Sequence, residues 1–441
     1  MKRLIHNGTI INEGAIYKAN ILIENGYIVE IGKNIESSDC EIIDATGCYV
    51  IPGVIDDQVH FREPGLTHKG SIKEGSRAAA AGGVTSFMDV PNVKPATTTN
   101  ELLKEKQKIA ANDSIINYSF YLGATNDNIE EIKNIDPRSV CGLKLFMGSS
   151  TGNMLVDNPE TLKEIFMNSP VLIAAHCEDT PTINANIAKY KEIYGEDIPV
   201  TLHDKIRSRE ACYKSSSLAA SLAKEYGARL HILHLSSAEE VELLDKGNIN
   251  EKKITGEVCV HHLFFNNSAY STMGNFVRWN PAIKEESDRK ALISAINNGI
   301  INVVATDHAP HTIEEKTGSY TKAAGGGPLV QHSLVMMLEL AERGETIMQK
   351  VVETMCHAPA QLYNIDKRGF IRKGYKADIC IFKKESWSVS KENILYKCGW
   401  SPLEGKTFTY KVVETIVNGA TVYKNGSFNE EIKGELLQFA R

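Results

Sequence analysis

The sequence lacks features that mark several whole classes of protein. No stretch approaches the ~20 consecutive apolar residues that a membrane-spanning helix requires. The opening MKRLIHNGTI has no apolar core of a signal peptide, and no long basic run occurs in a chain of net charge −6. The nine cysteines stand singly in apolar runs, so buried free thiols explain them better than disulfides or a zinc knuckle. We therefore expect a cytoplasmic protein with a small-molecule ligand and no nucleic-acid or membrane partner.

Short strand-like segments form both ends of the 441-residue chain. Segments such as IHNGTIINEG and NILIENGYIVEIG, with Asn-Gly turns, lie near the N-terminus, and the same texture returns in GFIRKGYKADICIF and YKVVETIVNGATVYKNGSF. We therefore expect a small β-sandwich domain formed from both chain termini, residues 1–50 and 368–441, around a central domain at residues 51–367.

The central domain alternates between apolar runs and helix-like stretches such as TTTNELLKEKQKIAAND. The apolar runs cover residues 54–61, 84–90, 117–124, 140–147, 171–179, 229–237, 254–263 and 301–310. Eight strands, most of them followed by a helix, predict an α/β fold of the (β/α)8 TIM-barrel type. An open doubly wound sheet would also alternate, but no GxGxxG motif follows any of these strands. Residues 181–214 are expected to be a helical insertion after the fifth strand.

Polar side chains stand where the predicted strands end, and barrel enzymes place their chemistry at that end. Lys144 is the most unusual of these residues, because a lysine buried among apolar neighbours must be paired or neutral. A neutral lysine reacts with carbon dioxide to give a carbamate, which bridges two cations; a salt bridge to Asp307 is the alternative. The other strand-end residues are Gln58, His60, Arg62, Asn92, His176, His234, Asp307 and His311.

The remaining histidines have plainer explanations. His231 lies three positions before His234 on a strand, which predicts that it faces the opposite side. His261 and His262 are adjacent, so only one of them can face the mouth, and both are candidates for groups behind the site. Hydrogen-bonded core or surface positions are expected for His203, His231, His332 and His357.

These motifs together resemble the amidohydrolase superfamily and, within it, the dihydroorotases of pyrimidine biosynthesis. The resemblance covers about residues 50–365 and is carried by VHFREPG, GGVTSFMDVPN, GLKLFMGSS, AAHCED, HILHLSS, RWNPAIK and VVATDHAPHT. It implies zinc-dependent, reversible hydrolysis of the cyclic amide of dihydroorotate to N-carbamoyl-aspartate. One departure stands out, because the family's first strand ends in His-x-His and this chain has Gln58-Val59-His60.

The resemblance also implies a metal centre with a carboxylated lysine shared between two sites. One site would consist of carboxylated Lys144, His176 and His234, and it should hold zinc firmly. The other would consist of Gln58, His60, Lys144 and Asp307. A glutamine oxygen is a poorer zinc donor than an imidazole, so this second zinc should be weakly held. Asp307 would take the proton of the attacking water and deliver it to the leaving amide nitrogen.

The same resemblance suggests how the substrate is held. A guanidinium matches a carboxylate bidentately, so Arg62 would bind the free carboxylate of dihydroorotate, with a salt bridge to Glu63 or Asp56 as the plainer explanation. Further substrate contacts are expected from Asn92, Asn280, His311, Gly325 and Gly326. Two alternatives stay open: a hydantoinase-like or allantoinase-like enzyme, and a non-catalytic dihydroorotase-like subunit marked by Gln58. We also expect a homodimer.

Overall fold

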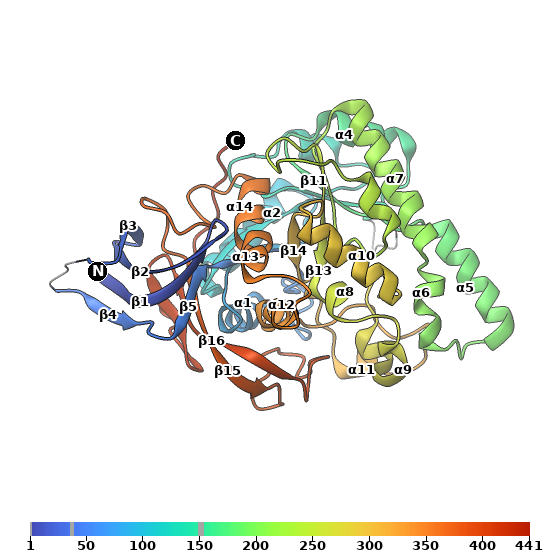
Figure 1. The fold of residues 1–441 in the computed structure, drawn as a ribbon. Coiled ribbons are helices and arrows are strands. Elements are labelled where there is room, and N and C mark those ends of the chain that lie inside the picture. Colours follow the sequence, from blue (N-terminus) through green and yellow to red (C-terminus); the bar gives the residue numbers. More distant parts are fainter. Residues whose placement is uncertain (1, 36–38, 149–153) are drawn as a thin grey trace.

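A computed structural model describes residues 2–35, 39–148 and 154–441 of the chain (Figure 1). Its central part is a closed barrel of parallel strands, with helices around it, and a β-rich unit packs against one side. The two serines that end the GLKLFMGSS motif, Ser149 and Ser150, lie outside the described residues.

The barrel contains the eight predicted strands in the predicted order. They are β6 (Val54–Val59), β7 (Val84–Asp89), β8 (Asn117–Phe120) with its continuation β9 (Leu122–Gly123), β10 (Leu143–Phe146), β11 (Ile173–His176), β12 (Leu230–Ile232), β13 (Ile254–Cys259) and β14 (Val303–Ala305). The hydrogen bonds form two arcs, β6-β7-β8 and β14-β13-β12-β11-β10-β9. The His60 amide donates to the His308 carbonyl at 2.7 Å, which joins the first strand to the eighth. The (β/α)8 prediction is confirmed.

Helices follow most of these strands, and several begin at a side chain that caps the first turn. Ser71, Thr99 and Ser208 each accept a hydrogen bond from a backbone N–H of the helix that follows. The helices around the barrel are α1 (Ile72–Ala81), α2 (Asn100–Asp113), α3 (Ile129–Lys133), α4 (Pro159–Asn168), α7 (Arg209–Tyr226), α8 (Val260–Phe264), α9 (Ala269–Met273), α10 (Glu286–Asn297), α11 (Ile313–Lys316), α12 (Ser333–Glu342), α13 (Met348–Val352) and α14 (Ala358–Tyr363). Shorter turns are η2 (Glu239–Leu243), η3 (Gly274–Val277) and the π-type turn η4 (Glu353–His357).

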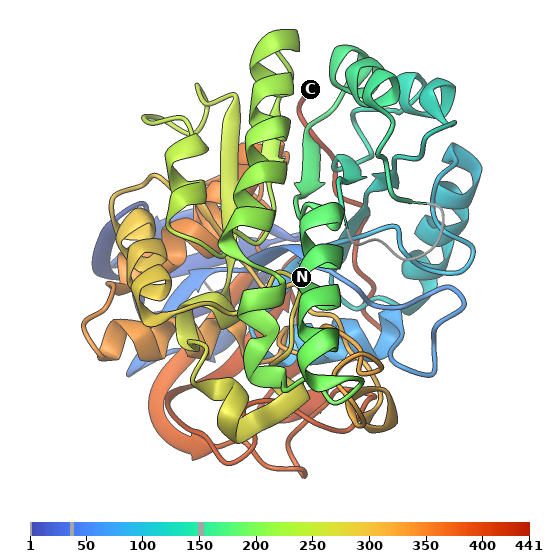
Figure 2. The same ribbon diagram turned by 90° about the vertical axis from the view of Figure 1, so that its right-hand side faces the viewer.

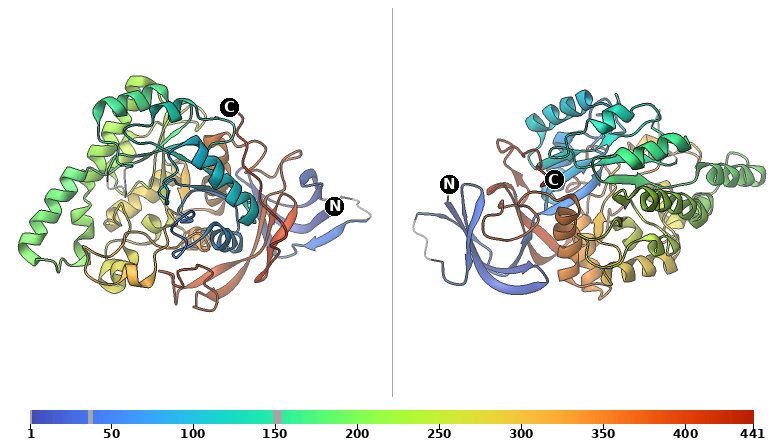
Figure 3. Two further views of the ribbon diagram at one scale, coloured as in Figure 1. Left: turned by 180° about the vertical axis from the view of Figure 1, so that it is seen from behind. Right: turned by 90° about the horizontal axis from the view of Figure 1, so that it is seen from above.

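The insertion after the fifth barrel strand is helical. It contains α5 (Thr180–Tyr194), the turn η1 (Val200–Leu202) and α6 (His203–Ile206), and it continues into α7. Figure 2 shows α5 beside α7 in front of the barrel, and in Figure 3 this limb projects on the side away from the β-rich unit.

The β-rich unit joins the two ends of the chain in a single sheet. Its strands are β1 (Lys2–Asn12), β2 (Ala15–Glu24), β3 (Tyr27–Gly32), β4 (Glu41–Asp44), β5 (Cys48–Pro52), β15 (Ile379–Ser388), β16 (Thr407–Val417), β17 (Ala420–Lys424) and β18 (Ser427–Phe428). β5 pairs antiparallel with β15, so the blue and red strands lie side by side in Figure 3. The domain limits at residues 50 and 367 stay predictions, and β5 runs across the first of them.

The C-terminal part of the chain also packs on the barrel itself. Beyond β18, the Leu437 amide donates to the Tyr118 carbonyl of β8 at 2.8 Å, and Arg441 donates to the Cys141 carbonyl at 2.8 Å. Between β15 and β16, the Trp400 indole N–H donates to the His311 carbonyl at 2.7 Å. Residues 368–441 therefore support the barrel mouth as well as completing the sheet.

Two further observations bear on the composition of the chain. Within the described ranges, no helix has both the length and the apolar character needed to cross a membrane. Seven of the nine cysteines are buried, and no disulfide joins any pair of them in the described chain.

Candidate metal centre and substrate pocket

A cavity of ≈ 420 Å³ opens at the carboxyl ends of the barrel strands. All twelve residues that the sequence analysis proposed for the site line it: Gln58, His60, Arg62, Asn92, Lys144, His176, His234, Asn280, Asp307, His311, Gly325 and Gly326. The structure thus brings together residues spread over most of the barrel sequence. The individual roles of these residues remain predictions.

Three of the lining residues have unusual backbone conformations. Arg62, His234 and Asp307 adopt positive φ values of 69°, 40° and 48°, in the region that side chains other than glycine rarely occupy. Such conformations persist where the surrounding structure enforces them, and they concentrate at functional sites. They also explain why His234 and Asp307 turn into the mouth although each lies two residues past the end of its strand, β12 or β14.

The first pair of candidate ligands is His176 with His234. Nδ1 of His176 and Nε2 of His234 lie 3.0 Å apart, and both rings are buried. Two nitrogens bound to one tetrahedral zinc at its usual bond lengths would be about 3.3 Å apart, so this pair fits a shared ion. Burial, with the neighbouring His176, holds the pKa of His234 well below its ordinary value. The neutral imidazole that results is the form that binds metals.

The second candidate group is His60 with Asp307 and Gln58. Nε2 of His60 lies 2.9 Å from Oδ1 of Asp307, and the Gln58 amide nitrogen donates to the same oxygen at 3.3 Å. The Gln58 oxygen, the atom expected to contact a metal, faces the Cys259 sulfur at 4.0 Å instead. This group therefore offers a metal one imidazole and one carboxylate. The Gln58 oxygen points toward Cys259 and is not placed as a third ligand.

Lys144 lies within β10 and is 1 % exposed. In the described part of the chain no carboxylate lies within ion-pair distance of its amino group, so the expected alternative, a salt bridge to Asp307, does not form. Burial lowers the pKa of Lys144 to about 8, although the charges of Asp307 and Glu257 oppose this shift. An amine of this kind fits carboxylation, and the donor set of Lys144, His176 and His234 then fits zinc.

Arg62 forms one wall of the cavity and has no acidic partner among the described residues. Its Nε donates to the Pro310 carbonyl at 3.0 Å, and its Nη2 donates to Nε2 of His311 at 3.1 Å. Glu63 instead accepts a hydrogen bond from the Ile72 amide, so the expected salt bridge to Glu63 is absent. Burial lowers the pKa of Arg62 to about 10, which leaves the guanidinium charged at neutral pH.

The amides and glycines complete this wall. Oδ1 of Asn92 and Oδ1 of Asn280 are buried, and neither has a hydrogen-bond partner among the described residues. A Cβ atom on Gly325 would lie 2.5 Å from the Asn280 amide nitrogen, and Gly326 has a φ of 123°. The Lys316 amino group donates to the Gly326 carbonyl at 2.8 Å and holds this segment against the mouth. The glycines therefore permit a close approach of the backbone to the site.

Two further cations line the cavity that no sequence pattern predicted, Lys69 and Lys94. The Lys69 amino group lies 2.8 Å from a Glu315 oxygen and 3.2 Å from Nδ1 of His311. Burial and the charge of Arg62 hold the pKa of His311 far below its ordinary value, so this ring is neutral. Both lysines lie in loops after strands, where no periodicity predicts the direction of a side chain. The only indication in the sequence was that they lie close to Arg62 and Asn92.

The four histidines that were expected at hydrogen-bonded core or surface positions are buried and hydrogen-bonded. His203 bonds to Tyr320, His357 to the Gly369 carbonyl and His332 to Tyr396. His231 bonds to Thr255 and Glu257, with Asp57 nearby.

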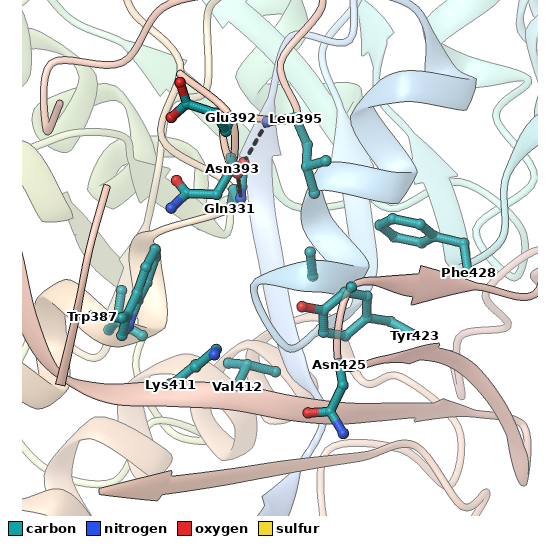
Figure 4. Close-up of a pocket in the computed structure, with 13 residues that line it drawn as sticks. Gln331, Trp387, Glu392, Asn393, Leu395, Lys411, Val412, Tyr423, Asn425 and Phe428 are labelled. Carbon is teal, nitrogen blue, oxygen red and sulfur yellow. Dashed lines mark hydrogen bonds between the residues drawn. The ribbon is translucent and has the colours of Figure 1, made fainter. Parts of the chain in front are cut away.

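A second cavity of ≈ 370 Å³ lies between the sheet and helices α1 and α12 (Figure 4). Trp387, Tyr423 and Phe428 form much of its wall, and Figure 4 shows Gln331 hydrogen-bonded within the segment around Asn393. None of the twelve predicted site residues lines this cavity. All twelve predicted site residues therefore belong to the cavity at the barrel mouth.

Comparison with known proteins agrees with this architecture. The model of the amidohydrolase family matches residues 49–422, and the chain belongs to this family. Within it, the chain is 32 % identical to the dihydroorotase of Methanosphaera stadtmanae over 405 residues, 91 % of this chain and 92 % of the relative. It is 31 % identical to the dihydroorotase of Methanosarcina acetivorans over 450 residues, 98 % of this chain and 95 % of the relative.

Solved structures of similar fold include enzymes with other names. The L-hydantoinase (dihydropyrimidinase) of Arthrobacter aurescens superimposes with a TM-score of 0.93 at 26 % identity, covering 99 % of both chains. The dihydropyrimidinase of Brevibacillus agri gives a TM-score of 0.88 at 26 % identity and covers 100 % of both chains.

Proposed function

We propose that this protein is a dihydroorotase, which reversibly hydrolyses the cyclic amide of dihydroorotate to N-carbamoyl-aspartate. The observation that carries the proposal is the buried guanidinium of Arg62, which faces the cavity without an acidic partner among the described residues. A buried cation of this kind requires an anion, and the carboxylate of dihydroorotate supplies one. The dihydroorotase relatives, which match this chain nearly end to end, support the same substrate.

The candidate metal ligands in the cavity would hold zinc. When bound, zinc polarises the scissile carbonyl and activates water at neutral pH. His176, His234 and carboxylated Lys144 would hold one zinc firmly, and His60, Asp307 and Gln58 would hold a second more weakly. Oδ1 of Asp307 is engaged by His60 and Gln58, and no hydrogen bond among the described residues engages Oδ2. Oδ2 would accept the proton of the attacking water and return it to the leaving amide nitrogen.

The wall of the cavity would orient the ring. The Arg62 guanidinium would bind the carboxylate, because its Nε and Nη2 are already fixed by Pro310 and His311 and the fork is therefore preorganised. The unpartnered oxygens of Asn92 and Asn280 would accept the ring N–H groups, and the backbone at Gly325 and Gly326 would contact the ring. Lys69 and Lys94 add positive charge, which favours the two carboxylates of N-carbamoyl-aspartate.

The proposal extends to the setting of the enzyme. The free cysteines and the acidic net charge support a cytoplasmic enzyme with no nucleic-acid or membrane partner, and the proposal includes that it works as a homodimer.

A substrate panel tests the proposal against its alternatives. Protein purified with zinc and bicarbonate is assayed with dihydroorotate, with hydantoin and with dihydrouracil, which is the same ring without the carboxylate. We expect turnover of dihydroorotate, and strong preference over dihydrouracil. Comparable turnover of dihydrouracil or hydantoin would favour a hydantoinase-like enzyme, and no turnover of any ring would favour the non-catalytic subunit.

A further inference from the structure

Behind Gln58, three side chains with metal-binding atoms meet in the barrel wall. Cys259 ends β13, and His261 and His262 lie in the first turn of α8. The Cys259 sulfur and one ring nitrogen from each histidine lie within 4.8 Å of one another. The two histidines are 0 % and 3 % exposed, and the cysteine is 0 % exposed. None of the three lines the cavity at the barrel mouth.

The hydrogen bonds of this group leave histidine nitrogens available to bind a metal. Nε2 of His262 lies 3.2 Å from the Pro281 carbonyl oxygen, which only accepts, so Nε2 carries the hydrogen. Nδ1 of His262 therefore presents its lone pair, and it has no partner among the described residues. A histidine held in this way, with one nitrogen donating to a carbonyl, is how metal ligands are oriented in proteins.

His261 shows a similar deficit. Its ring stacks on Trp279 at 4.4 Å with an interplanar angle of 16°, and the Thr306 backbone is the one group close enough to interact with a ring nitrogen, so the other nitrogen is left without a partner in the described chain. Leaving a buried polar atom unpaired costs free energy, so such atoms generally have a partner, which can be a protein group, a water or an ion. Burial and the neighbouring His262 hold the pKa of His261 well below its ordinary value, and burial lowers the pKa of His262 to about 4. Both rings are therefore neutral, as ligands must be.

We propose that Cys259, His261 and His262 form a zinc-binding site beside Gln58, separate from the ligands His176 and His234. One sulfur and two imidazole nitrogens make a donor set that selects zinc over magnesium or calcium. The Gln58 oxygen, 4.0 Å from the Cys259 sulfur, lies next to the site. Zinc binding forms a zinc–sulfur bond and releases the Cys259 thiol proton to solvent.

A second buried group, Asp57, His231 and Glu257, has its atoms equally close together. There, however, Nδ1 of His231 is bonded to Thr255 and Nε2 to Glu257, so no imidazole lone pair is free. The Cys259 group differs because its histidines have nitrogens without partners among the described residues. The proposal rests on that difference and is independent of the proposed catalytic function.

Cobalt substitution tests the site through its sulfur ligand. Metal-free full-length protein is titrated with Co²⁺, and its near-ultraviolet absorption is followed for a thiolate-to-cobalt charge-transfer band. We expect this band in the wild type and in the control Cys380→Ser, which removes another buried cysteine in β15, and we expect its loss in Cys259→Ser. Zinc per chain after identical dialysis should fall by about one ion in Cys259→Ser only. A wild type without the band, or unchanged zinc in Cys259→Ser, would overturn the site.

A second variant tests the site in case Cys259→Ser fails to fold. His261→Phe keeps a ring that stacks on Trp279 and removes both nitrogens, so it should fold and lose the same zinc. Full zinc retention in folded His261→Phe contradicts the proposal. Dihydroorotate turnover is measured on the same samples: failure of turnover with the cobalt band present counts against the catalytic function alone, and the reverse result counts against this site alone.

Discussion

The side-chain amide of Gln58 donates a hydrogen bond to Oδ1 of Asp307, with 3.3 Å between nitrogen and oxygen. His60 approaches the same oxygen at 2.9 Å. The family's first-strand imidazole is thus replaced by a neutral donor that orients the carboxylate and adds no nitrogen lone pair for a metal. We expect the substitution to weaken the proposed zinc site of His60 and Asp307, while Asp307 stays oriented for its proposed role in proton transfer.

Arg62→Met should remove the carboxylate anchor and leave the metals in place. Losing one partner of a buried charge pair costs roughly 2–4 kcal/mol, so kcat/KM for dihydroorotate should fall about 30- to 1000-fold. Turnover of dihydrouracil, if detectable, should change little, because it has no carboxylate. Arg77→Met, which removes a half-buried arginine of α1 that pairs with Glu430, is the matched control. Equal losses for both substrates would contradict the assignment of Arg62.

Lys144→Ala should lose zinc and activity together, because the proposed carbamate would disappear with the amine. Short carboxylic acids such as acetate should restore part of both by entering the vacated space as anionic ligands. Lys106→Ala is the control: it also removes a buried lysine, one paired with Asp89 at 2.8 Å, but the added acid should not rescue it. Retention of zinc by Lys144→Ala would exclude the bridging carbamate.

Zinc loading of the metal-free protein should depend on pH through Lys144. Burial lowers the pKa of Lys144 to about 8, and only the neutral amine reacts with carbon dioxide. At constant dissolved carbon dioxide, the loading rate should therefore rise about tenfold per pH unit below that pKa and level off above it.

The lowered pKa of Lys144 also makes the free energy of unfolding depend on pH, and it determines the direction of that dependence. The ordinary pKa of 10.5 lies above the folded value of about 8, so between these values the unfolded chain binds more protons. The free energy of unfolding of the metal-free protein should therefore rise with pH across this window, relative to Lys144→Met. Chemical denaturation at several pH values measures it, and the opposite slope would contradict a buried, unpaired Lys144.

The fold and the site could be predicted from the sequence because strand ends fix positions in a barrel. Polar residues at or near the carboxyl ends of the strands reach the same mouth, so Lys144, His176 and Asp307 converge whatever the loops do. The pairing of β5 with β15 was likewise signalled by the strand-rich character of both chain ends.

Where strands end, alternation no longer holds. Alternation predicts that His231 and His234 face opposite ways, and only His234 lines the cavity; but β12 ends at Ile232, so the φ of 40° at His234, and not alternation, sets its direction. The orientation of the Gln58 amide was equally unpredictable, because it depends on Asp307 and Cys259, which are distant in sequence. Lys69 escaped prediction because its direction is set by Glu315.

Gly325→Ala should impair substrate binding through Asn280. The new Cβ would lie 2.5 Å from the Asn280 amide nitrogen, so this side chain must move away from the cavity. Overpacking of this kind costs roughly 1–3 kcal/mol, and we expect it to appear as a higher KM for dihydroorotate with zinc content unchanged. Gly32→Ala, whose Cβ would meet only Ile35 at 3.7 Å, is the control. A normal KM in Gly325→Ala would show that Asn280 does not position the ring.

Gln58→His supplies the missing imidazole and tests its effect on zinc binding at the metal centre. The new nitrogen donor suits zinc better than an amide oxygen, so the site of His60 and Asp307 should hold its zinc more tightly. The comparison is best made in the Cys259→Ser background, which removes any zinc held by that cysteine. After identical dialysis, Gln58→His/Cys259→Ser should retain up to one more zinc per chain than Cys259→Ser alone.

Activity need not rise with this added zinc. Gln58→His removes the amide that donates to Oδ1 of Asp307, so the carboxylate loses part of its orientation while the metal site gains a ligand. We therefore expect more zinc with equal or lower kcat. Two firmly held zincs in Cys259→Ser alone would show that Gln58, or a water beside it, replaces histidine adequately. A wild type with neither zinc nor turnover, even after loading with zinc and bicarbonate, would identify Gln58 as a mark of a non-catalytic subunit.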